Sequence, residues 1–272
     1  MKIAQYYTKE GTGAGFIDGN TLYPVKMQGD IPDMIAGGQD FIKSGEGIPL
    51  ENIRFAPPIS RPSKIIGIGL NYMDHIREGS AGIPEIPMVF AKFQNSLVGH
   101  GGTITWTPSL TKQVDFEAEL AIVIGKTLHE CPEERVLEGI FGYTCANDVS
   151  ARDIQFGDGQ WVRGKSLDTF CPLGPWIVTS DEIRDPHSLN IRCLLNGRIM
   201  QDGNTEQMLF KIPRLISFLS KNFTLIPGDI ILTGTPSGVG CFREPPVFLK
   251  DGDVIAVEIE KVGRLENHCR TH

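Results

Sequence analysis

Residues 113–125 read Gln-Val-Asp-Phe-Glu-Ala-Glu-Leu-Ala-Ile-Val-Ile-Gly. The apolar run over 120–124 predicts a strand, in which residues two apart share a face. Asp115, Glu117 and Glu119 are therefore expected on one side, with apolar residues on the other. Three acids on one face are typical of a solvated surface, but they also suit a hard cation such as Mg²⁺, Mn²⁺ or Ca²⁺, which prefers oxygen ligands. Taken alone, the stretch leaves both interpretations open.

Strand-like runs recur on both sides of this stretch, at 64–68, 176–178, 189–195, 229–232 and 254–259. Helical patterns are fewer and fall at 72–78, 133–140 and 208–219. Pro213 marks either a kink in the last of these or its true start. Strands dominate without a regular βαβ alternation. The sequence therefore predicts a mainly β fold of the α+β class, a mixed β-sandwich or roll with peripheral helices.

The first sixty residues differ in pattern from the rest. Residues 3–25 predict short strands separated by turns at 11–15 and 18–20, and a helix is expected over 31–43. The proline-rich segment 56–62 suits neither a helix interior nor a central strand, because proline lacks the amide donor. We therefore expect a small N-terminal β-rich domain of residues 1–60 and a main domain of residues 61–272.

Composition narrows the classes of function. Of 272 residues, 40% are hydrophobic and 22% are charged, as in folded soluble proteins. The formal charge of −7, without a basic cluster, argues against nucleic-acid and membrane partners. The sequence shows no secretory leader, no run long enough to span a membrane and no C-x-x-C pair among its six cysteines. A cytoplasmic protein is predicted, in which any anionic substrate must be captured locally, with help from a cation.

Three further segments carry candidate chemistry. His75 and Glu78 lie three apart on a predicted helix, a spacing that suits a water-activating pair or an ordinary surface pair. Asp148, in 147–155, suits a metal ligand or a turn residue. Lys165, before a Pro/Gly-rich turn, suits an active-site cation or a surface charge. Neither 67–72 nor 234–240 completes a nucleotide-binding fingerprint.

Six motifs in this order resemble the fumarylacetoacetate hydrolase family over residues 61 to about 262. They are G-x-N-Y-x-x-H-x-x-E at 69–78, D-F-E-A-E-L at 115–120, N-D-V-S-A-R-D at 147–153, G-K-S-L-D-T-F at 164–170, L-N-G at 195–197 with Gln201, and G-T-P-x-G-V-G at 234–240. The chain is similar to single-copy members that act as acylpyruvate hydrolases or oxaloacetate decarboxylases. The resemblance implies a mixed β-sandwich roll and a homodimer.

The resemblance also assigns roles to nine residues. They are the metal ligands Glu117, Glu119 and Asp148, a water-activating dyad of His75 and Glu78, and contacts to substrate or to developing negative charge from Arg152, Gln155, Lys165 and Thr235. The implied cofactor is Mg²⁺ or Mn²⁺ rather than Ca²⁺. Oxygen ligands and a 2-oxo acid together suit a metal-stabilised enolate.

We therefore expect a hydrolase or lyase that cleaves a carbon–carbon bond in a small 2-oxo acid, either an acylpyruvate or oxaloacetate. The alternatives are an isomerase or tautomerase of an unsaturated 2-hydroxy or 2-oxo diacid, and a lyase acting on an acid such as ureidoglycolate. A relative without catalysis, which senses a metal–acid complex, is the non-enzymatic alternative.

Overall fold

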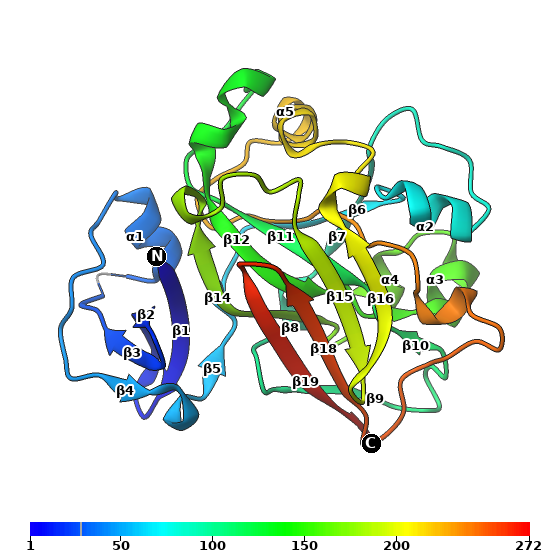
Figure 1. The fold of residues 1–272 in the computed structure, drawn as a ribbon, viewed down its shortest axis with the longest axis horizontal. Helices are drawn as coiled ribbons and strands as arrows, with labels where there is room; N and C mark the ends of the chain where they lie inside the picture. Colours follow the sequence, from blue (N-terminus) through cyan, green and yellow to red (C-terminus); the bar gives the residue numbers. More distant parts are fainter. Residues whose placement is uncertain (28) are drawn as a thin grey trace.

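The computed structural model describes residues 1–27 and 29–272 (Figure 1). Its larger sheet has twelve strands. Along its main path they are β4 (Ile48–Pro49), β3 (Thr21–Pro24), β2 (Gly11–Asp18), β1 (Lys2–Thr8), β14 (Cys171–Thr179), β12 (Ile140–Asn147), β11 (Ala118–Ile124), β17 (Ile230–Leu232), β6 (Ile65–Gly69) and β7 (Met88–Lys92), with β5 (Phe55–Ala56) beside β1 and β8 (Leu97–Val98) beside β14.

A five-stranded sheet forms the second layer. Its order is β16 (Arg198–Asn204), β15 (Asn190–Leu195), β18 (Val254–Ile259), β19 (Gly263–Thr271) and β9 (Thr103–Trp106), while β10 (Val114–Asp115) pairs with β13 (Ser150–Ala151) apart from both sheets. The helices are peripheral: α1 (Ile31–Ala36), α2 (Met73–Glu78), α3 (Arg152–Asp158), α4 (Val162–Lys165) and α5 (Ile212–Asn222). The predicted α+β fold is confirmed.

Strand β11 explains why its sequence is apolar along its whole length. Leu120 and Ile122 join the core between the two sheets, whereas Ala121 and Val123 join a second core on the other face. A strand covered on both faces reads as a continuous hydrophobic run. Glu119 shares the face of Ala121 and Val123, so its carboxylate is directed into buried surroundings rather than toward water.

The N-terminal strands extend the main sheet instead of forming a sheet of their own (Figure 1). Strand β1 pairs with β14 through Lys2 opposite Val178 and Ile3 opposite Ile177. Ile3 also belongs to the same buried cluster as Ile177 and Ile230 from the main part of the chain. The N-terminal unit thus shares a core with the rest of the molecule.

Several expected element boundaries are corrected by the structure. Residues 11–15 were expected to form a turn but lie in β2, where a side chain at Gly15 would come within 2.5 Å of Leu22. The glycines therefore let strands pack closely. Helix α1 stops at Ala36, not at 43, because Gly37 and Gly38 follow, the latter with φ of 58°.

Of the two remaining helical segments, one differs from expectation and the other is decided between its two alternatives. The segment expected to be helical over 133–140 is a 3₁₀ helix over Glu133–Gly139. Helix α5 begins at Ile212, so Pro213 marks the start of the helix and not a kink. None of the helices in the described part of the chain has both the length and the hydropathy that crossing a bilayer requires.

Candidate active site

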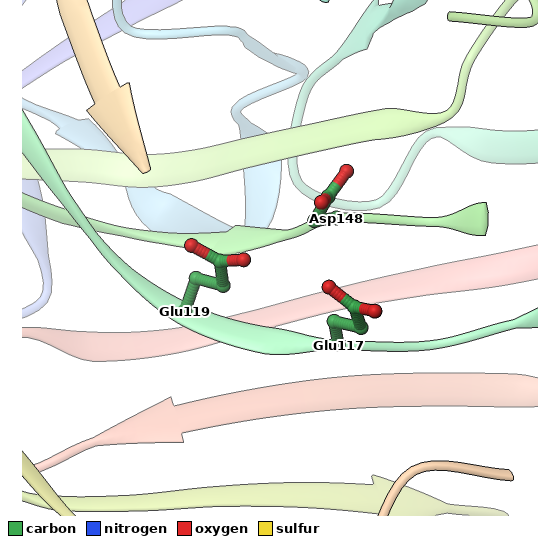
Figure 2. Close-up of side chains that lie close together, drawn as sticks. All are labelled: Glu117, Glu119 and Asp148. Carbon is green, nitrogen blue, oxygen red and sulfur yellow. The ribbon is translucent and has the colours of Figure 1, made fainter. Parts of the chain in front are cut away.

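Three buried carboxylates converge beside strands β11 and β12 (Figure 2). Glu117 immediately precedes β11, Glu119 lies near its start, and Asp148 directly follows β12. The two strands pair with Ala118 opposite Asn147, and the Asp148 amide donates to the Glu117 carbonyl at 2.9 Å. This register brings one oxygen of each carboxylate to within 4.8 Å of the others. The first acid of the motif, Asp115, lies outside this cluster because the strand is interrupted at 116–117.

The cluster is electrostatically incomplete at Glu119. Burial, together with the charges of Asp148 and Glu117, raises the pKa of Glu119 well above its usual range. The Gly234 amide donates a hydrogen bond to its Oε2 at 2.6 Å. An extra positive charge at this point would let all three carboxylates ionise. Buried carboxylate oxygens in this number are the ligands that Mg²⁺ and Mn²⁺ prefer, so the residues present fit a hard divalent cation.

Glu117 shows the opposite shift. Burial acts to raise its pKa, but Lys165, Arg152 and His75 together hold the pKa well below the usual range of a glutamate. Lys165 Nζ lies 2.9 Å from Glu117 Oε2 and 2.5 Å from Asp148 Oδ2. Arg152 Nη2 lies 2.6 Å from Glu117 Oε1. Lys165 is thus a buried active-site cation and not a surface charge.

Asp115 has a different role from the one its motif suggests. It is fully buried and accepts hydrogen bonds from the amides of Gly240 and Cys241, at 2.7 and 3.0 Å. Arg152 Nε donates to it at 2.9 Å. Asp115 therefore joins the loop over 237–243 to the guanidinium that contacts Glu117.

His75 and Glu78 meet on helix α2, as the spacing predicts. His75 Nδ1 lies 3.2 Å from Glu78 Oε2, and Glu78 Oε1 accepts from the Gly238 amide at 2.8 Å. The His75 ring, largely buried, packs against Phe242 with centroids 5.8 Å apart. Because the Glu78 carboxylate can only accept, the neutral imidazole carries its proton on Nδ1 and leaves Nε2 free as a base.

The remaining candidates are buried but already engaged. Gln155 Oε1 accepts from Arg152 Nη1 at 2.9 Å, which leaves its amide group as a donor. The Thr235 hydroxyl donates to the Ala118 carbonyl at 2.9 Å and accepts from Gln201 Nε2 at 2.8 Å. Gln201 Oε1 in turn accepts from the Ala118 amide at 2.9 Å. Thr235 and Gln201 therefore hold the strand between the two glutamates, and binding of a substrate carboxylate by Thr235 stays a prediction.

One residue of the site has no place in the sequence-based prediction. Lys92, at the end of β7, is buried and places Nζ 2.6 Å from Asp148 Oδ1. Strand alternation puts it on the same face as the buried Phe90, and a lysine at such a position is a usable signal. Its partner, however, lies 56 residues away, beyond any local pattern.

Comparison with known proteins identifies the family. The sequence profile described as fumarylacetoacetate (FAA) hydrolase C-terminal matches residues 64–270. The chain belongs to the fumarylacetoacetate hydrolase family. The resemblance carried by the six motifs is thereby confirmed.

Similar proteins in the fumarylacetoacetate hydrolase family have several names. The Rattus norvegicus protein named mitochondrial oxaloacetate tautomerase Fahd2a is 44% identical over 275 residues, covering 95% of this chain and 85% of its own. The solved fumarylacetoacetate hydrolase of Exiguobacterium antarcticum is 36% identical with a TM-score of 0.90. The 5-carboxymethyl-2-hydroxymuconate delta-isomerase of Mycobacterium smegmatis is 37% identical with a TM-score of 0.85. Both structures match over 100% of each chain.

These relatives bear on the sequence-based predictions at a coarse level. The chain is an enzyme of a family whose members act on small acids. Neither hydrolysis nor decarboxylation is singled out, because the names include tautomerases and isomerases. The rat relative is named mitochondrial, so the cytoplasmic location stays a prediction.

Proposed function

We propose that this enzyme uses Mg²⁺ or Mn²⁺ to interconvert the keto and enol forms of a small 2-oxo diacid, with oxaloacetate as the first candidate. The observation that carries the proposal is the buried cluster of Glu117, Glu119 and Asp148, with Lys165 bridging two of its members. The name of the rat relative supports the choice of reaction. The three carboxylates would hold the cation.

A bound divalent cation supplies a Lewis acid that favours negative charge on a 2-oxo oxygen. The chain adds fixed positive charge around the same place. Burial acts to lower the pKa of Lys165, but Asp148 and Glu117 raise it above the usual range, so the ammonium stays charged. Lys165 and the free amide of Gln155 are donors for the oxygen on which charge develops. Such donors in a water-poor site are each worth several kcal/mol, on the order of 3.

Proton transfer falls to His75. Glu78 holds its Nδ1–H, so Nε2 can take a proton from C3 of the keto acid. The electron pair of that C–H bond becomes the new C2–C3 double bond, and the 2-oxo oxygen gains a proton to give the enol. The reverse sequence returns the keto form. Contact with Phe242 and the Glu78 bond to Gly238 keep the imidazole in place.

Hydrolysis of an acylpyruvate is the second candidate, and the His75–Glu78 pair favours it. In that reaction Nε2 takes a proton from water, and hydroxide adds to the distal carbonyl. The C3–C4 bond then breaks, and its electrons remain on the pyruvate enolate, which is protonated at C3. The same pair argues against a silent sensor, because sensing alone does not require an oriented base.

The test is a substrate panel with purified protein in Mg²⁺ or Mn²⁺. Enol and keto oxaloacetate, an acylpyruvate and an unsaturated 2-hydroxy diacid are compared by ultraviolet absorbance and product analysis. We expect the enol–keto conversion of oxaloacetate to be the fastest catalysed reaction. Faster turnover of the acylpyruvate would transfer the assignment to the hydrolase. Absence of turnover across the panel, in folded protein that binds Mn²⁺, would contradict both assignments.

A further inference from the structure

The Lys92 ammonium is fully occupied by acceptors within the protein. Its side chain is fully buried at the end of β7, the last strand of the larger sheet. Nζ lies 2.6 Å from Asp148 Oδ1 and 3.4 Å from the Val149 carbonyl, and it also contacts the Lys165 carbonyl. An ammonium has three protons, and three acceptors are present. Lys92 therefore has no donor left for a substrate.

The two lysines that contact Asp148 differ in their surroundings. Lys165 touches Oδ2 of Asp148 and also Glu117, both members of the carboxylate cluster. Lys92 touches Oδ1 of Asp148, and its other partners are backbone carbonyls. Lys165 thus faces the cluster, whereas Lys92 supports one member of it from the side.

The charges of the region explain why such support is needed. Asp115, Glu117, Glu119 and Asp148 supply four buried carboxyl groups, and Lys92, Lys165 and Arg152 supply three buried cations. Removing one partner of a buried ion pair strongly destabilises a protein, because the remaining charge is left without compensation. Asp148 is fully buried, and each of its two carboxylate oxygens contacts the ammonium of a buried lysine.

We infer that Lys92 is a positioning residue, an internal counter-ion that keeps Asp148 oriented before any divalent cation binds. This inference rests on the metal site proposed above. A divalent cation held by the cluster would supply positive charge to the same carboxylate, Asp148. Bound metal should therefore compensate in part for loss of the Lys92 charge. A residue that only fills space has no such link to metal.

The experiment measures thermal unfolding of the full chain in excess chelator and in saturating Mn²⁺. Lys92→Met removes the charge and keeps much of the side-chain length. In chelator we expect its melting temperature to fall by about 10 °C, the size expected for a broken buried ion pair in a chain of this length. In Mn²⁺ the deficit relative to the parent should shrink to less than half, because the cluster without the Lys92 charge is more negative and binds the cation more tightly, so bound metal stabilises the variant more than the parent.

Lys64→Met is the matched control. Lys64 pairs with another fully buried aspartate, Asp229, at 2.8 Å, next to the opposite end of β17 from the site. The same substitution there removes a lysine from a buried aspartate without touching the cluster, although the Lys64 side chain is itself 27% exposed. We expect its deficit to be equal in chelator and in Mn²⁺.

The outcomes separate the inference from the site on which it rests. An equal deficit for Lys92→Met with and without Mn²⁺, in a parent that Mn²⁺ stabilises, would overturn the role of Lys92 and leave the metal site intact. No effect of Mn²⁺ on the parent would overturn the metal site and this inference with it. If Lys92→Met fails to fold in either condition, the double variant with Asp148→Asn decides: recovery in chelator supports the counter-ion, and failure to recover overturns it.

Discussion

Among single residues, Glu119 is the carboxylate of the cluster that lacks a compensating positive charge within the residues that the structure describes. Glu119→Gln should raise the stability of protein in chelator by about 1–3 kcal/mol, because an amide at a buried position avoids the cost of an uncompensated charge. The gain should grow as pH rises, since the raised folded-state pKa makes Glu119 destabilising once pH exceeds the usual range of a glutamate.

Urea unfolding in chelator at several pH values measures this change, and Mn²⁺ calorimetry measures the expected loss of metal binding. A variant that is less stable than the parent at every pH would show that the Glu119 charge is already compensated.

The role of His75 as a general base can be tested by substitution. His75→Ala should slow enol–keto conversion and acylpyruvate hydrolysis by about 10²–10⁴-fold, because both require a general base. Any decarboxylation of oxaloacetate should fall far less, since carbon dioxide leaves without a base. Oxalate affinity, measured on parent and variant, checks that binding survives. Equal losses in all reactions, with oxalate affinity unchanged, would contradict a dedicated base.

The site residues differ in how far sequence could foresee them. The cluster of Glu117, Glu119 and Asp148 could be anticipated, because each acid lies in a short motif that resembles the family. The contact of Lys92 with Asp148 could not, since the two residues lie 56 positions apart in the sequence. Burial could not be foreseen either: a lysine such as Lys165 reads as a surface charge until both neighbouring carboxylates are placed beside it.

At the scale of elements, Asp115 anchors the loop over 237–243 against the site. Asp115→Asn keeps one acceptor for the Gly240 amide but removes the charge that pairs with Arg152. We expect a loss of about 3–5 kcal/mol in stability, as for other broken buried pairs. The loop also holds Glu78 through Gly238, so its amides should exchange faster with solvent and kcat should fall.

Unfolding and hydrogen exchange measure the two effects. Asp153→Asn is the control, because Asp153 is an exposed aspartate that accepts hydrogen bonds from Thr111 and Lys112 rather than from this loop. Similar exchange of the loop in both variants would show that Asp115 does not anchor it.

Element boundaries depended on contacts that no local pattern reports. The strand core of β11 was predictable from its apolar run, and α5 needed only a choice between two readings of Pro213. The Gly-rich stretch 11–15 misled because glycine serves both turns and close strand packing, and only the position of Leu22 on β3 shows which applies.

For the whole molecule, the division into domains at residue 60 stays a prediction. The shared core nevertheless predicts that the two parts unfold together. Ile3 and Ile31 lie in one cluster with Ile177 and Ile230, so unfolding either part exposes the other. We expect a single calorimetric transition whose calorimetric and van't Hoff enthalpies agree. Two separated transitions would show that the N-terminal unit is energetically independent.

The predicted homodimer requires a surface on which two chains can pack. Exposed apolar side chains gather around β7, the edge strand of the larger sheet: Ile83, Ile86, Met88, Val89 and Phe93. Exposed edges of this kind tend to be covered. Light scattering should give twice the chain mass for the parent and a lower mass for Val89→Lys. A monomeric parent would contradict the prediction.

The central claim is that three buried carboxylates hold a divalent cation on which the reaction depends. The most direct measurement is the rate of oxaloacetate enol–keto conversion after metal removal and after readdition of Mg²⁺ or Mn²⁺, in the parent and in Asp148→Asn. We predict that activity disappears in chelator and returns with metal in the parent, while Asp148→Asn stays inactive in both. Full activity of the parent in excess chelator, with no metal bound, would contradict the account.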